Sequence, residues 1–88
     1  MSPNYPNPFN PSTRIDIQTS ERNDLNVRIF DATGRLVNNL MDKQLDAGHY
    51  TVKWNGLDSK GIGMPTGVYF MQIKYGFIVN TQKLILIK

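Results

Sequence analysis

The chain contains no cysteine, and this excludes a disulfide, a thiol nucleophile and a cysteine zinc site. It also lacks any stretch near the roughly 18 apolar residues that a membrane-spanning helix needs. The residues after Met1 form no charged segment followed by an apolar one, so we expect no N-terminal export signal in this chain. The sequence therefore predicts no membrane insertion, and it leaves the redox compartment open.

Side chains that carry chemistry are scarce and scattered. His49 is the single histidine, and its place beside a turn predicts a solvated residue at the start of a strand. The seven acids are spread along the chain, mostly in turns, without metal-ligand spacing. Gly61 and Gly63 precede no predicted helix, so a phosphate-binding loop is not expected. We therefore expect no enzyme activity, no catalytic residue, no metal and no cofactor.

Length and composition predict one small folded domain. The 88 residues are 40% hydrophobic and 19% charged, as in globular proteins, and a chain this short buries a thin core. The net charge of +3 comes from bases that are spread along the sequence and form no run. Because nucleic-acid-binding proteins concentrate such charge in a patch or stripe, we do not expect a nucleic-acid partner.

The opening segment is rich in proline, at positions 6, 8 and 11. Proline fixes its own φ and pushes the preceding residue toward extended geometry, so the segment is expected to be stiff and solvated. It suits a spacer that keeps something upstream at a distance, or a Pro-rich ligand for an aromatic groove. No basic residue flanks the prolines on their N-terminal side, which favours the spacer. We assign residues 1–13 to a Pro/Asn-rich linker and residues 14–88 to a folded domain.

Polar and apolar residues alternate with a period of two through most of this domain, and turn-forming residues separate the alternating segments. The expected strands are 14–18, 25–30, 35–41, 49–55, 68–75 and 77–88. Segment 35–41 fits a bulged strand or one helical turn equally well, and we assign a strand because a hairpin turn precedes it. The pattern indicates an all-β fold, an antiparallel immunoglobulin-like β-sandwich of about seven short strands.

Two regions can carry a function. The loop 56–67 is rich in glycine and proline, and a crossover between two sheets is favoured over a functional loop. Near the C-terminus, four apolar residues follow one another between Lys83 and Lys88. This predicts a strand with apolar cover on both faces and a position at a sheet edge, where backbone groups are open to a partner. A strand that only closes the core, with lysines guarding against aggregation, is a compatible interpretation.

Aromatic residues raise a further alternative. If Tyr50, Trp54, Tyr69 and Tyr75 lay on an exposed sheet face, they would stack on sugar rings. The alternation predicts instead that most of them point inward, with Trp54 in the core. A carbohydrate-binding module is therefore the less favoured alternative.

Five segments, in order and over nearly the whole chain, resemble a known group of domains. They are YPNPFNPSTRI, VRIFDATGRLV, AGHYTVKWNGLDSKG, PTGVYFMQIKYG and KLILIK. They are similar to the C-terminal sorting domains of type IX secretion cargo and to the related immunoglobulin-like domain named after the flagellar hook-capping protein FlgD. The resemblance implies a non-catalytic β-sandwich that follows a larger, covalently linked N-terminal passenger.

In the sorting family, the type IX translocon recognises the domain and takes the cargo from the periplasm to the cell surface or medium. A sortase-like protease of the outer membrane then removes the domain, and these are the partners that the resemblance implies. The implied recognition residues are Pro65, Gly67, Tyr69, Lys83, Leu84, Ile85, Leu86, Ile87 and Lys88. The linker motif falls on Pro6, Asn7, Pro8 and Phe9. The FlgD-like branch implies an alternative, a structural spacer module of an extracellular enzyme.

Overall fold

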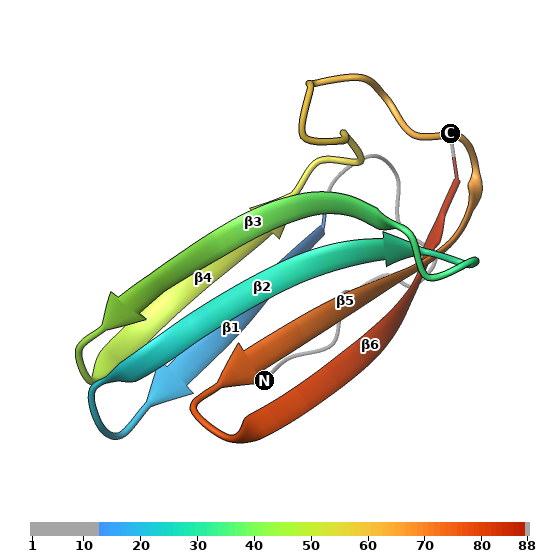
Figure 1. Cartoon of the computed structure of the whole chain (residues 1–88). Coiled ribbons are helices and arrows are strands. Elements are labelled where there is room, and N and C mark those ends of the chain that lie inside the picture. The colour runs from blue at the N-terminus through green and yellow to red at the C-terminus, as the bar shows by residue number, and fades with distance from the viewer. Residues whose placement is uncertain (1–12, 88) are drawn as a thin grey trace.

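The computed structural model describes residues 13–87 and contains two antiparallel sheets packed face to face (Figure 1). The strands are β1 (Thr13–Thr19), β2 (Asn23–Asp31), β3 (Leu36–Leu45), β4 (Gly48–Trp54), β5 (Gly67–Tyr75) and β6 (Ile78–Leu86). The smaller sheet pairs β1 with β4, and the larger sheet has the order β3, β2, β5, β6. The predicted all-β antiparallel sandwich is confirmed, with six strands among the described residues instead of about seven.

Segment 35–41 belongs to a strand, as predicted, and its ambiguous period has a structural cause. The pairing of β2 with β3 shifts register between Val27 and Arg28 and again between Ile29 and Phe30. Each shift leaves an extra β3 residue in the ladder and interrupts the two-residue alternation. Residues 13–87 contain no helix, and hence none that is long and apolar enough to cross a membrane.

The core lies between the two sheets and is built from alternate residues of each strand. β2 and β5 each bury every second side chain because the small sheet covers one face of the large one. The buried apolar residues are Ile15, Leu25, Val27, Ile29, Val37, Val52, Trp54, Tyr69, Met71, Ile73, Leu84 and Leu86. Trp54 is 0% exposed, so its predicted place in the core is confirmed.

The long loop between β4 and β5 passes from the small sheet to the large one, which confirms the crossover interpretation. Hydrogen bonds fix this loop to β4 and to β3. The indole Nε1 of Trp54 donates to the carbonyl of Leu57 at 2.8 Å, and Asn38 Nδ2 donates to the same oxygen at 3.1 Å. The backbone N–H of Ser59 donates to the carbonyl of Val37 at 3.1 Å. The loop is therefore an ordered cap over one end of the sandwich.

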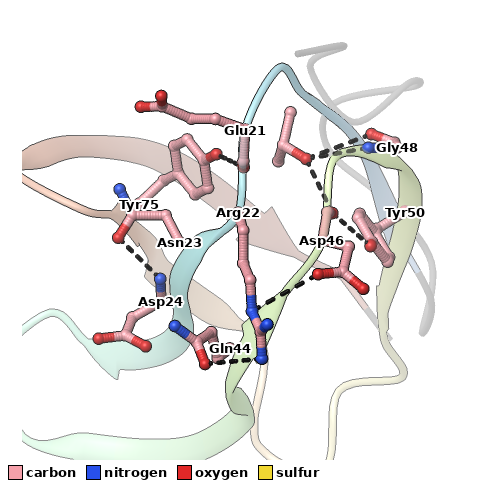
Figure 2. Close-up of polar contacts among 10 residues, drawn as sticks. Glu21, Arg22, Asn23, Asp24, Gln44, Asp46, Gly48, Tyr50 and Tyr75 are labelled. Atoms are coloured by element: carbon pink, nitrogen blue, oxygen red, sulfur yellow. Dashed lines mark hydrogen bonds and ion pairs between the residues drawn. The ribbon is translucent and has the colours of Figure 1, made fainter.

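The opposite end is closed by contacts among its turns (Figure 2). Arg22, in the β1–β2 turn, forms an ion pair with Asp46 at 3.5 Å and donates to Gln44 Oε1 at 3.1 Å. The hydroxyl of Tyr75 donates to the carbonyl of Glu21. These contacts join the β1–β2 turn to the end of β3 and to the end of β5, so the three turns hold one another in place.

The β5–β6 hairpin fixes the position of the last strand. The predicted tight reversal at 75–77 is confirmed, because β5 ends at Tyr75 and β6 begins at Ile78. Gly76 has φ +59°, a left-handed conformation that glycine adopts at no steric cost. Its N–H donates to the carbonyl of Asp24 at 3.1 Å, which secures the hairpin to β2. A two-residue reversal leaves no slack, so β6 must run back along β5 in a single register.

Candidate functional site

The two sequence motifs implied in recognition lie side by side. In the β5–β6 pairing, Gly67 is opposite Leu86 and Tyr69 is opposite Leu84. The loop residue Pro65 precedes this pair of strands and is exposed. The start of β5 and the end of β6 therefore form one contiguous element at the end of the sandwich that also carries the crossover loop (Figure 1).

Tyr69 connects the loop to this element. Its hydroxyl donates to the carbonyl of Pro65 at 2.6 Å, and its ring packs edge-on against Trp54 with centroids 5.2 Å apart. A tyrosine near the start of a strand that bonds back to the preceding backbone is the tyrosine corner of immunoglobulin-like sandwiches. Burial raises the pKa of Tyr69, and the charge of Asp31 adds to this effect, so the hydroxyl stays protonated as a donor.

The terminal strand divides its residues between two faces. Leu84 and Leu86 are 0% exposed and pack in the core, whereas Lys83 lies exposed on the other face and Ile85 is half-buried there. Ile87, just after the strand, is 45% exposed. The expectation that this segment has apolar cover on both faces is wrong, because the second sheet covers the inward face alone. The outward residues are therefore available to a partner.

The edge position predicted for the last strand is confirmed. Within residues 13–87, β6 pairs with β5 on one side and has no paired strand on the other. Its backbone groups on that side are open to an added strand. Lys88 and the linker motif at Pro6, Asn7, Pro8 and Phe9 lie outside the described residues.

A second tyrosine corner was missed by the sequence analysis. The hydroxyl of Tyr50 donates to the carbonyl of Asp46 at 2.6 Å, again four residues upstream (Figure 2). Gly48 stands two residues before it, and a Cβ there would lie 3.7 Å from that hydroxyl. The shared spacing of glycine and tyrosine in DAGHY and PTGVY is the signal that could have revealed it. The same local device thus starts one strand in each sheet.

The aromatic residues do not form a sugar-binding face. Trp54 and Tyr69 are at most 3% exposed, and the hydroxyls of Tyr50 and Tyr75 donate to backbone carbonyls. Stacking a sugar on the two buried rings would require opening the core. The carbohydrate-binding alternative therefore has no platform among these four residues.

Two loop carboxylates serve the backbone around them. Asp58 Oδ1 accepts the N–H groups of Ile62 and Lys60, each at 2.9 Å, and these bonds lower the pKa of Asp58. Asp31 Oδ1 accepts the hydroxyl of Thr33 at 2.6 Å and the N–H of Arg35 at 3.0 Å, and the pKa of Asp31 is lowered likewise. Both aspartates stabilise turns, as their sequence positions suggest.

A shallow hollow of about 280 Å³ lies between the β2–β3 turn and the crossover loop. It is lined by Arg35, Leu36, Val37, Asp58, Ser59 and Met64. The carboxylate of Asp58 in this hollow already accepts two backbone N–H groups.

His49 is exposed on β4, as predicted, in the other sheet. Within residues 13–87, no three histidine or acidic side chains gather to hold a metal ion.

The fold and the tyrosine corner define an immunoglobulin-like sandwich domain. The family model of the FlgD Ig-like domain matches residues 4–76, and the chain belongs to this family. The match ends at the β5–β6 hairpin, so β6 lies beyond it. No curated protein sequence is significantly similar to the chain.

Solved structures with the same fold include two proteins of Porphyromonas gingivalis. Dimeric latent PorU is 22% identical, with a TM-score of 0.67 over 96% of this chain and 9% of its own, and shows the fold alone. PorZ, described as an essential bacterial surface component of the type-IX secretion system, is 26% identical, with a TM-score of 0.64 over 96% of this chain and 11% of its own.

FlgD from P. aeruginosa is also similar. It is 25% identical, with a TM-score of 0.61 over 84% of this chain and 57% of its own. The chain thus spans less than two thirds of each of these three proteins. Each comparison concerns one module within a longer polypeptide.

We predict that Tyr69→Phe lowers the free energy of unfolding by about 1 kcal/mol, because the substitution removes one hydrogen bond and keeps the ring. Tyr50→Phe is the matched control, since it removes the same bond in a more exposed setting. Its loss should be smaller, because water can replace the hydroxyl there. Urea unfolding of both variants measures the difference, and equal losses would show that burial of the Tyr69 corner adds nothing.

A pH series tests the loop carboxylate. Because the pKa of Asp58 is lowered in the folded chain, its stabilising effect is full above the unfolded pKa of about 3.9 and is lost as pH falls through the folded pKa. Asp58→Asn should therefore be less stable than the parent at pH 7. The two melting temperatures should converge in acid. A gap of constant size down to pH 2 would contradict this role.

Proposed function

We propose that the chain is a non-catalytic sorting module that directs a covalently linked N-terminal passenger through the outer membrane by type IX secretion. The module travels through the periplasm to the cell surface or medium. Its partners are the translocon, which recognises the folded domain, and a sortase-like protease, which removes it. The Pro/Asn-rich linker at residues 1–13 separates the passenger from the module and contains the site of cleavage.

The similarity to PorZ carries this proposal. The alignment covers 96% of this chain and only 11% of PorZ, a surface component of the type-IX secretion system. A small domain of this fold thus occurs as one part of a larger protein at that surface. The open edge of β6 suits a module that is recognised while another domain acts.

The terminal strand is the part of the module that the translocon contacts. Its inward residues Leu84 and Leu86 hold the strand in the sandwich, and its free edge and outward residues face solvent. Recognition thereby depends on folding, because the strand is positioned only when β5 and the tyrosine corner are formed. An unfolded module would not present this strand, so recognition depends on the folded state of the module itself.

A structural spacer module is the second candidate. The similarity to FlgD favours it, since FlgD is a different protein in which a domain of this fold covers 57% of the chain. A spacer needs a stiff linker and a stable sandwich, and it makes no use of the open edge of β6. The two candidates therefore differ in whether the outward residues of the last strand matter.

Export of a fusion protein separates these functions. The chain is placed behind a signal-peptide-bearing fluorescent protein, in type IX-competent cells and in a translocon-null strain. We predict that surface and medium fluorescence depends on the translocon. A folded fusion that stays in the periplasm of both strains would contradict sorting and favour the spacer.

A matched pair of variants locates the recognition element in the same assay. Ile85→Thr and Ile87→Thr together change the outward side and should lower export at least about tenfold while the purified domain stays folded. Thr51→Ser, on the exposed side of β4, should export normally. Thermal melting of each purified domain separates lost recognition from lost stability.

A further inference from the structure

The outward face of the large sheet carries a row of side chains that crosses all four strands. Phe30 of β2 is opposite Leu36 of β3 and Phe70 of β5, and Phe70 is opposite Lys83 of β6. Phe30 follows the fully buried Ile29, so alternation places it on the face away from the core. This face, toward the viewer in Figure 1, is covered by no second sheet in residues 13–87.

The end of this face next to the β2–β3 turn is apolar. Leu36 is 51% exposed, and Phe30 and Phe70 are half-buried. The next row adds Val68 opposite Ile85, both half-buried. Two phenylalanines with three aliphatic side chains form a contiguous strip that runs to the free edge of β6. Strips of this kind on a folded domain mark contact surfaces for a partner.

Two basic residues border the strip on this face. Arg28 lies two residues before Phe30 on β2, and Lys83 lies opposite Phe70 on β6. The acids of the outward face, Asp24 and Asp42, stand at the other end of their strands, where Lys74 lies in the same row as Asp42. Asp31 near the strip is engaged by its own turn and by Arg35, at 3.3 Å. The border of the strip therefore favours negative charge in a partner.

Polar groups on this face are also incompletely satisfied. Arg28 Nε and Asn26 Oδ1 are covered by neighbouring atoms, and neither has a hydrogen-bond partner within residues 13–87. They belong to alternate residues of β2 and so share the outward side. Buried polar atoms without partners are rare and costly in a free domain.

We propose that this face, defined by Phe30, Leu36, Phe70, Ile85 and Lys83, docks an apolar protein surface bordered by carboxylates on an outer-membrane component of the export machinery. The inference rests on the proposed sorting function and adds a partner surface to it. β6 would contribute the edge of the interface, and the two phenylalanines its centre. Aromatic residues at the centre and charges at the rim are the usual anatomy of protein interfaces.

Three substitutions at one position test the charge. In the exported fusion, Lys83→Arg should match the parent, Lys83→Gln should export less, and Lys83→Glu should lose at least about tenfold, because like charges would then meet across the interface. Lys53→Glu is the control, since Lys53 is exposed on the smaller sheet. It should export normally. Equal export of all three Lys83 variants would overturn the acidic border.

Phe70→Thr tests the apolar centre, and threonine suits a strand so that folding is kept. Export should fall at least about tenfold while thermal melting shows a folded domain. A photo-crosslinking residue at position 36 should capture a translocon component, whereas one at position 51, on the smaller sheet, should not. Normal export of Phe70→Thr, or equal capture from both positions, would overturn the docking face.

The outcomes for the two proposals are distinct. If the unmodified fusion is not exported in a translocon-dependent way, the sorting function fails, and this inference fails with it. If the unmodified fusion is exported and the Lys83 and Phe70 variants are exported to the same extent, the sorting function stands and the docking face alone is wrong. Lys83→Glu exporting as well as Lys83→Gln would indicate a partner without carboxylates, and would reject the chemistry proposed here.

Discussion

The hydrogen bond from the Tyr69 hydroxyl to the carbonyl of Pro65 is the constraint on which the rest of the candidate site depends. It closes the crossover loop onto the start of β5, while the tyrosine ring packs edge-on against Trp54 in the core. Because β5 and β6 form a two-residue hairpin, fixing β5 also fixes the register of the last strand. Loop, core and terminal strand are thereby one cooperative unit.

Stability and recognition use the same strand but different side chains of it. The two-residue period of a strand sends Leu84 and Leu86 inward and leaves Lys83 and Ile85 outward. A truncation removes both sets together, and its effect on export therefore has two causes. Substitutions on one side separate them, because each buried leucine contributes about 1.5–3 kcal/mol and the outward residues far less.

Local pattern predicted much of this structure, and relations between distant strands were harder to see. The alternation in β2, β4 and β5 identified their buried faces, and the glycine at 76 identified the last hairpin. The two register shifts between β2 and β3 hid the period of β3. The pairing of Gly67 with Leu86 could have been predicted by counting residue pairs back along both strands from the hairpin. The row from Leu36 to Lys83 could not, because it depends on the strand order β3, β2, β5, β6.

The terminal strand is fixed to β5 on one side and open on the other. Amide hydrogen exchange along β6, measured residue by residue on the free chain, tests this most directly. Alternate amides bond to β5 and should exchange slowly, while those between them point to the free edge and should exchange fast. Uniformly slow exchange from Asn80 to Leu86 would show that the edge is already occupied and would contradict the account.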